Sequence, residues 1–266
     1  ALGVWSVQTL FELDKPPAGS DVLEVTATGH QWWFEFEYPD ADGNGTFVTT
    51  ANELKVPVGR PVHVNLLSDD VLHSFWVPRL AGKVDMVPTR SNHLWFQADE
   101  TGVFHGQCAE LCGRAHALMK FRVQALPEDE YLAWVSGFGK EPVLSAQASQ
   151  GQLVFNGEGG CVVCHTANGP DSPSTVDARV QGFLAGLESP VAPGPNLTDL
   201  ATRGTFAAGI LDLNRENLRK WITDPESVKS GNYMSGRATV YQTSDGTTKL
   251  NQKQVSNVIE YLLSLK

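Results

Sequence analysis

The sequence is organised around the stretch Cys108-Ala-Glu110-Leu-Cys112-Gly-Arg-Ala-His116-Ala-Leu-Met119. It brings two thiols, an imidazole and a thioether together, and a second imidazole, His73, lies upstream in Val71-Leu-His73-Ser-Phe-Trp76. Such soft donors suit copper. A single blue copper needs only two histidines, one cysteine and a weak axial methionine. The second cysteine is therefore enough for two thiolates to bridge two metal ions.

A structural zinc site of the Cys₂His₂ type is the alternative for the same residues. Zinc would leave Met119 without a role, and the spacing Cys-x₃-Cys-x₃-His is not that of the common zinc fingers. The donor set therefore favours copper over zinc.

His73 and the pattern Cys108-x-Glu110-x-Cys112-x₃-His116-x₂-Met119 resemble the binuclear copper A motif of cytochrome c oxidase subunit II. The resemblance covers about the first half of the chain and extends to these segments: Gly29-His-Gln-Trp-Trp33, Asp70-Val-Leu-His73-Ser74, Val77-Pro-Arg-Leu80 and Lys83-Val-Asp85-Met-Val-Pro88. One departure is Thr89-Arg90, where the family usually has Gly-Arg, and it touches no metal ligand.

The resemblance implies a complete set of copper ligands. In the family the two cysteines bridge both coppers, and each copper takes one histidine. One copper adds the methionine, and the other adds the backbone carbonyl at the glutamate position. Carried over by position, these ligands are Cys108, Cys112, His73, His116, Met119 and Glu110.

Two further roles are implied by the resemblance. The carboxylate of Glu110 would help to hold a magnesium ion at the boundary with a membrane subunit, where a hard, oxygen-preferring ion fits. Trp32 would be the residue through which electrons reach copper A, although its position also permits a plain core aromatic. Acidic residues follow it in the sequence: Glu35, Glu37, Asp40 and Asp42.

The charge of the chain is uneven. Residues 1–137 carry 9 Lys/Arg and 18 Asp/Glu, whereas residues 138–266 carry 11 and 12. An acidic first half argues against nucleic acid, which needs a basic face, and suits a positively charged protein partner. An acidic surface with no partner would have the same composition.

Residues 17–135 are predicted to form an all-β, cupredoxin-like Greek-key sandwich, which is also the fold of the family. Segments rich in β-branched and aromatic residues predict strands at 22–38, 61–66, 94–97 and 119–125. Residues 127–135 predict a short helix with acids in its first turn, and residues 136–144 a linker. No stretch reads as a signal peptide or a membrane helix. Residues 1–16 are interpreted as the end of a membrane helix, since such helices precede this domain in the family.

The segment Glu158-Gly-Gly-Cys161-Val-Val-Cys164-His165 carries the C-x-x-C-H motif of c-type haem attachment. Cys161 and Cys164 can add to the two haem vinyl groups, which aims His165 at the iron. A thioredoxin-type redox pair is the alternative, but it needs no histidine and expects a βαβ setting. Because both close cysteine pairs have these explanations, we expect no disulfide.

Met234 is the predicted sixth ligand of the iron, because no other methionine follows residue 119 and no histidine follows His165. Its setting, Gly231-Asn-Tyr-Met234-Ser-Gly236, predicts a loop, which argues against a flexible core filler. Ligation by methionine and histidine raises the haem potential, as an electron carrier requires. The proline that often follows this ligand in the cytochrome family is missing here.

Residues 145–266 are predicted to form an all-α domain of the class I cytochrome c type. Helices are expected at 145–155, 214–222 and 251–265. The segment Pro193-Gly-Pro195-Asn-Leu197 resembles the part of these cytochromes that packs on the proximal histidine.

The motifs indicate the extracytoplasmic part of an oxidase subunit II fused to a c-type cytochrome, on the periplasmic side of a bacterial cytoplasmic membrane. The resemblance implies electron flow from an external donor through haem c and copper A to the membrane catalytic subunit I of a proton-translocating oxidase, which reduces dioxygen. That donor is a cytochrome c, another small redox protein or a respiratory complex. The haem domain is expected to dock beside Trp32.

Other functions stay open on the sequence. A nitric oxide reductase with copper A can share both modules, and nitrous oxide reductase shares copper A without the fused haem. From another class, a periplasmic copper-binding or copper-delivery protein would hold a labile, mononuclear copper beside an accessory haem.

Overall fold

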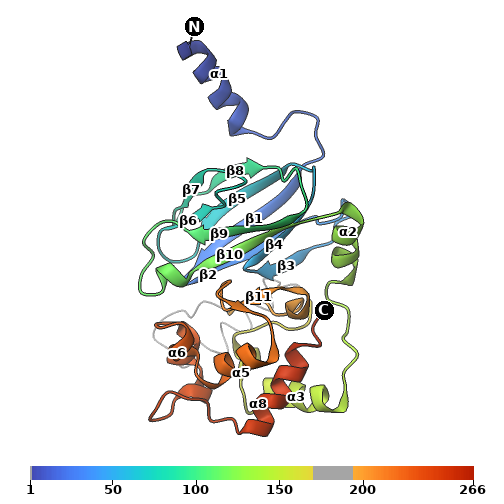
Figure 1. Cartoon of the computed structure of the whole chain (residues 1–266), viewed down its shortest axis with the longest axis vertical. Coiled ribbons are helices and arrows are strands. Elements are labelled where there is room, and N and C mark those ends of the chain that lie inside the picture. The colour runs from blue at the N-terminus through green and yellow to red at the C-terminus, as the bar shows by residue number, and fades with distance from the viewer. Residues whose placement is uncertain (1, 170–193) are drawn as a thin grey trace.

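The computed structural model describes residues 2–169 and 194–266, which form two units with separate apolar cores (Figure 1). Ala1 of the predicted N-terminal segment and Pro193 of the Pro-Gly-Pro segment lie outside these residues. The first helix, α1 (Leu2–Asp14), has no buried residue and extends away from both units. Among the described residues, no helix has both the length and the apolar character needed to cross a membrane.

Two five-stranded sheets form the first unit, so the β fold predicted for it is confirmed. One sheet has the order β3 (Val48–Ala51), β2 (Trp33–Tyr38), β1 (Leu23–His30), β5 (Val62–Ser68) and β8 (Asn92–Phe96). The other has the order β4 (Glu53–Pro57), β10 (Lys120–Leu126), β9 (Gly102–Cys108), β6 (His73–Trp76) and β7 (Lys83–Met86). β1 pairs with β5 in parallel, as β10 does with β4.

An aromatic cluster joins the two sheets. The rings of Phe34 and Phe36 on β2 lie 4.7 and 5.8 Å from the ring of Phe121 on β10. Phe75 on β6 lies 4.7 Å from the same ring, and all four side chains are fully buried. Burying each of them contributes about 1.5–3 kcal/mol. The ring of Phe121 also lies against Gly106 of β9, so the cluster packs close to His73 at the start of β6 and to Cys108 at the end of β9.

The prediction of one strand over residues 22–38 was wrong in one respect. The chain turns at Gln31 and Trp32, and β1 pairs with β2 as an antiparallel hairpin in which His30 faces Trp33. The apolar pattern runs through both strands because both face the same core, so it gives no sign of the turn. The turn matters because it places Gln31 and Trp32 at the end of the sandwich.

The second unit is mainly helical. Within the described part of this unit, the longer helices are α3 (Ala146–Asn156), α5 (Arg215–Thr223) and α8 (Gln252–Leu262), and the short ones are α6 (Pro225–Val228) and α7 (Tyr233–Arg237). The described 3₁₀ turns are η1 (His116–Leu118) in the first unit, and η2 (Cys161–Val163), η3 (Leu200–Thr202) and η4 (Thr239–Tyr241) in the second. Ser145, Asn214 and Asn251 cap the three longer helices, which stabilises each by about 1 kcal/mol.

The prediction of an all-α second domain is not confirmed, because β11 (Thr205–Phe206) and β12 (Leu211–Asp212) form an antiparallel pair. The pair lies at the boundary with the first unit. There the buried carboxylate of Glu53 accepts hydrogen bonds from Thr205 N and Oγ1, at 2.7 and 2.6 Å. A contact with the other unit therefore shapes this short segment.

Helix α2 (Glu128–Gly137) packs Tyr131 and Val135 against the sandwich and runs two residues into the predicted linker. The chain then passes to α3 without regular structure, and the domain limits given above stay a prediction.

A buried ion pair lies where the two units meet. Asp199 accepts a hydrogen bond from Arg203 Nε at 3.1 Å and others from the first unit, from Thr50 Oγ1 at 3.0 Å and Trp134 Nε1 at 3.3 Å. Burial opposes ionisation of Asp199, but the charges of Arg203 and Lys55 hold its pKa below the ordinary value. The carboxylate therefore joins the two units as an anion.

Replacing Asp199 by Asn should lower the free energy of unfolding by about 3–5 kcal/mol, the usual cost of breaking a buried ion pair. Urea titration measures this loss. Folding lowers the pKa of Asp199. Its contribution to the free energy of unfolding is therefore present above the pKa of an unfolded aspartate, and it is lost as the pH falls through the lower pKa of the folded protein. The difference between wild type and variant should therefore shrink on acidification.

The matched control is Glu216→Gln, which breaks an ion pair with Lys220 on the exposed face of α5. It should leave the free energy of unfolding essentially unchanged, because exposed pairs are screened by water. An Asp199→Asn protein as stable as this control would show that the buried pair does not hold the units together.

Candidate copper and haem sites

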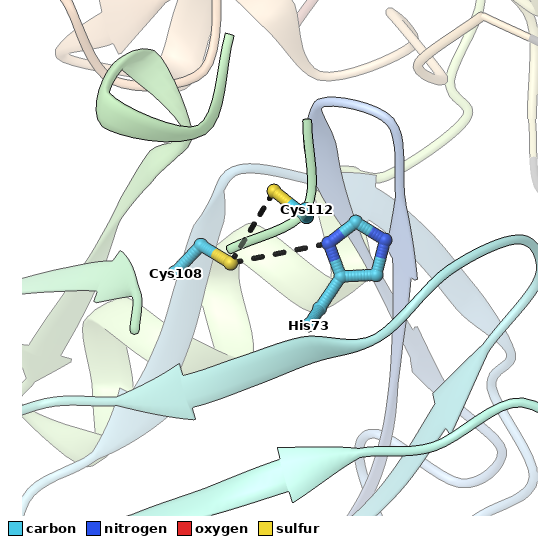
Figure 2. Close-up of side chains that lie close together, drawn as sticks. All are labelled: His73, Cys108 and Cys112. Atoms are coloured by element: carbon cyan, nitrogen blue, oxygen red, sulfur yellow. Dashed lines mark hydrogen bonds between the residues drawn. The ribbon is translucent and has the colours of Figure 1, made fainter. Parts of the chain in front are cut away.

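Two cysteines and a histidine from different parts of the first unit meet in one buried cluster (Figure 2). Cys108 Sγ lies 3.7 Å from Cys112 Sγ and 3.9 Å from His73 Nδ1. His73 begins β6 and Cys108 ends β9, and these strands are neighbours in the second sheet. The sheet therefore brings together two donors that are far apart in the sequence.

The other predicted copper ligands surround the same two sulfur atoms. Cys112 Sγ lies 3.5 Å from His116 Nδ1 and 3.8 Å from Met119 Sδ. Cys108 Sγ lies 3.2 Å from the carbonyl oxygen of Glu110. The structure thus gathers every predicted donor, and the set exceeds the four ligands of a closed structural zinc site. Sulfur-rich donors with two imidazoles fit copper.

The thiol pair has a strongly uneven affinity for protons. The hydrogen bond between them lowers the pKa of Cys108 and raises that of Cys112. The first proton therefore leaves easily, whereas a second thiolate in the same buried site would be repelled. Bound cations remove that repulsion, which is why the pair fits bridged metal ions.

Asp70 orients one of the histidines. Its Oδ1 lies 2.7 Å from His73 Nε2, and its Oδ2 accepts a hydrogen bond from Gln31 N at 2.7 Å. A proton held on Nε2 by Asp70 leaves Nδ1 unprotonated and facing Cys108, and carboxylates commonly orient metal-binding histidines in this way. Gly29 must lack a side chain, because a Cβ there would lie 2.8 Å from the ring of His73. Asp70 could have been found in the sequence, three residues before the ligand.

One largely apolar cavity is lined by Cys161, Cys164, His165 and Met234 of the second unit, and also by residues of the first unit, among them Trp32 and Trp33. His165 Nδ1 lies 2.8 Å from the carbonyl oxygen of Pro195, so Nδ1 carries the proton and Nε2 is the nitrogen suited to bind iron. Two thiols and two iron donors in an apolar cavity fit a covalently attached haem.

Met234 lies in the short helix α7, so the expectation of a loop was wrong. Asn232 caps this helix by accepting a hydrogen bond from Ser235 N at 2.8 Å, and the cap starts a helical turn despite the flanking glycines. The helix still directs Met234 to the cavity that His165 lines.

Trp32 connects the two sites. Its Nε1 donates to the carbonyl oxygen of Cys112 at 3.0 Å, and Trp32 also lines the cavity that contains His165 and Met234. Lys229 donates from Nζ to the carbonyl oxygen of Trp32 at 2.5 Å. Burial lowers the pKa of Lys229 to about 7, although the nearby Cys112 opposes the shift. Nothing in the sequence marked Lys229, since lysines are usually exposed.

Comparison with known families separates the same two parts. Residues 41–126 match the family described as "Cytochrome C oxidase subunit II, periplasmic domain", and residues 148–266 match the family "Cytochrome c". The first range contains the copper cluster, and the second contains the haem-attachment motif.

Similar proteins match both parts at once. The "Cytochrome c oxidase subunit 2" of Alkalihalophilus pseudofirmus is 39% identical over 253 residues, which cover 94% of this chain and 64% of that protein. The protein of the same name from Bacillus sp. (strain PS3) is 36% identical over 280 residues, which cover 100% of this chain and 70% of that protein. The chain thus spans about two thirds of the length of these relatives.

Among solved structures, the chain is similar to the periplasmic domain of subunit II of cytochrome oxidase of Bradyrhizobium japonicum. The two are 34% identical with a TM-score of 0.41, and the match covers 46% of this chain and 94% of that domain.

If Cys112 bridges a copper pair, replacing it by Ser should abolish the mixed-valence copper absorption and leave the haem bands intact, because one of the two sulfur atoms of the cysteine pair is lost. Visible spectroscopy of the copper-loaded protein measures both. Cys161→Ser is the reciprocal control, which should weaken haem attachment and spare the copper bands. A Cys112→Ser protein with the wild-type copper spectrum would rule out the bridge.

If Met234 is the sixth ligand, replacing it by Ala should lower the haem potential and open the iron to external ligands, since the thioether that lines the cavity with His165 is removed. Redox titration and carbon monoxide binding test this. A variant that keeps its potential and still excludes carbon monoxide would mean that another residue is the ligand.

Proposed function

Because the chain belongs to the cytochrome c oxidase subunit 2 family, we propose that it is the electron-transfer subunit of a haem-copper oxidase, with copper A in a cupredoxin-like first domain and haem c in the second. The proposal rests on the position of Trp32. Its indole donates a hydrogen bond to Cys112 in residues 108–119, the copper loop, and it also lines the cavity that contains Cys161, Cys164, His165 and Met234, the haem cavity. When bound, the two groups supply reversible one-electron chemistry.

The proposal assigns a separate role to each group of side chains. Cys108 and Cys112 would hold copper through their thiolates, while Asp70 holds His73 in the tautomer that presents Nδ1. His116, Met119 and the carbonyl of Glu110 would complete the set of copper ligands. Cys161 and Cys164 would attach the haem, and His165 and Met234 would bind its iron.

The packing of the second unit supports one direction of electron flow. Trp32 is only 7% exposed, because Tyr233 and Lys229 of the second unit lie against it. A separate cytochrome has no room to dock on this tryptophan. The external donor, a cytochrome c or another one-electron carrier, must therefore deliver to the haem, and the electron reaches copper A within the chain.

The copper loop also presents a face for a further partner. Leu111 is 76% exposed and lies between Glu110 and Cys112. An apolar side chain in this position suits docking on the membrane catalytic subunit I, together with the other subunits of the oxidase. Glu110 would then lie at the boundary, where its carboxylate can help to hold a magnesium ion. This face would then meet the membrane subunit on the periplasmic side of a bacterial membrane.

Gas consumption by the intact complex tests the proposal. Uptake of dioxygen supports a proton-translocating oxidase, whereas uptake of nitric oxide would indicate a nitric oxide reductase. Electron paramagnetic resonance of the purified chain separates a third function. A mixed-valence copper pair supports electron transfer, and the hyperfine pattern of a single copper would indicate a copper-delivery protein.

Replacing Trp32 by Phe should strongly slow the reduction of copper A after flash reduction of the haem, because Phe cannot donate to Cys112. Both spectra should stay unchanged. High salt should slow the external donor but not this internal step, because the contact between the units is buried. Trp95→Phe is the control, since Trp95 Nε1 bonds only Leu13 O at the far end of the sandwich. An unchanged internal rate in Trp32→Phe would place the electron path elsewhere.

A further inference from the structure

Tyr233 is the first residue of α7 and directly precedes Met234. Its side chain reaches into the first unit, where its ring lies 5.2 Å from the ring of Trp32, tilted by 43°. Its hydroxyl donates a hydrogen bond to Gln31 Oε1 at 2.5 Å. One side chain thus contacts both residues of the turn between β1 and β2.

These two residues also bond the same atom of the copper loop. Gln31 Nε2 and Trp32 Nε1 both donate to the carbonyl oxygen of Cys112, at 2.7 and 3.0 Å. Tyr233 therefore stands at the junction of two short contact paths. Each leads from the residue beside Met234 to the backbone of a candidate copper ligand.

The neighbours of Tyr233 hold it in this position. The guanidinium of Arg237, one helical turn later, lies 3.9 Å from the centre of the Tyr233 ring. Lys229 donates to the carbonyl oxygen of Trp32, and Arg114 of the copper loop donates to Ser230 Oγ at 2.8 Å and Glu226 Oε1 at 3.2 Å. Several independent contacts thus fasten the segment that carries Met234 to the turn and the copper loop.

We propose that Tyr233 is a positioning residue for electron transfer from the haem cavity to the copper site, a role that rests on the function proposed above. Its ring fills the space between α7 and Trp32, and its hydroxyl fixes Gln31 against Cys112. One electron moves, no covalent bond forms or breaks, and the phenol keeps its proton. Because electron tunnelling weakens steeply across a gap, the ring contributes more than the hydroxyl.

The test uses the full chain with both groups bound. After flash reduction of the haem, Tyr233→Leu should reduce copper at least about tenfold more slowly, or about 1.4 kcal/mol in activation free energy. Tyr233→Phe keeps the ring and should stay close to the wild-type rate. The haem and copper potentials should be unchanged in both variants, which excludes a loss of driving force.

The control for looser packing is Arg122→Gln. Arg122 Nη2 donates to Gly209 O at 2.9 Å, so this variant weakens the contact between the units away from Gln31 and Trp32. Its rate should match wild type. Equal slowing in Arg122→Gln and Tyr233→Leu would overturn the proposal, because general docking would then account for both.

A second readout needs no copper. Hydrogen exchange in the copper-free protein should quicken at Gln31 and Trp32 in Tyr233→Leu. In Tyr233→Phe, which keeps the ring but loses the hydrogen bond to Gln31, it should quicken at Gln31 only and remain at the wild-type rate at Trp32. Unchanged exchange together with an unchanged electron-transfer rate in Tyr233→Leu would refute the role of Tyr233 alone. Absence of haem-to-copper transfer in the wild-type chain would instead refute the proposed function.

Discussion

The sulfur atoms of Cys108 and Cys112 lie 3.7 Å apart in a buried site of the first unit. Two thiolates at this distance repel each other unless cations lie between them, so the fold has to hold the two side chains in place until a metal binds. Part of this support comes from Phe121, whose ring packs on Phe75 of β6 and lies against Gly106 of β9. Residues on packed strands hold donor positions better than residues on a free loop.

The second constraint is the contact between the two units. It contains buried charges, including Asp199, Arg203 and Glu53, rather than apolar side chains alone. Buried ion pairs add little net stability, yet breaking one is costly, so they favour a single arrangement of the partners. For the proposed transfer of electrons between the two sites, a fixed arrangement has a direct use. It keeps Trp32 at the haem cavity and removes the need for a diffusional encounter.

Trp32 takes part both in the support of the copper cluster and in the contact between the two units. Its indole nitrogen bonds the copper loop, its backbone carbonyl accepts from Lys229, and its ring meets Tyr233. The acidic first half of the chain suggested a docking surface for a basic partner. The structure instead places the second unit over this tryptophan, so any charge steering of an external donor would act at the haem.

The sequence by itself determined which side chains are candidate ligands at the two sites, because most of the donors lie close together in the chain. The segment from Cys108 to Met119 and the motif from Cys161 to His165 named these candidates without a structure, and the structure brings them together. The main helices and the β fold of the first half also followed from local patterns, with ends shifted by a few residues. Local patterns did not predict three features, which are the turn at Gln31, the helical setting of Met234 and the strand pair β11–β12.

Only the tertiary structure decided how the two sites are joined. Lys229 and Trp32 are 197 residues apart in the chain, and Tyr233 and Gln31 are 202 apart. Local patterns report propensities over a few residues, whereas such contacts depend on which faces of two separate cores pack together. A buried lysine or a tyrosine at such a boundary has no signature in sequence. Its role is defined by the partner that folding brings to it.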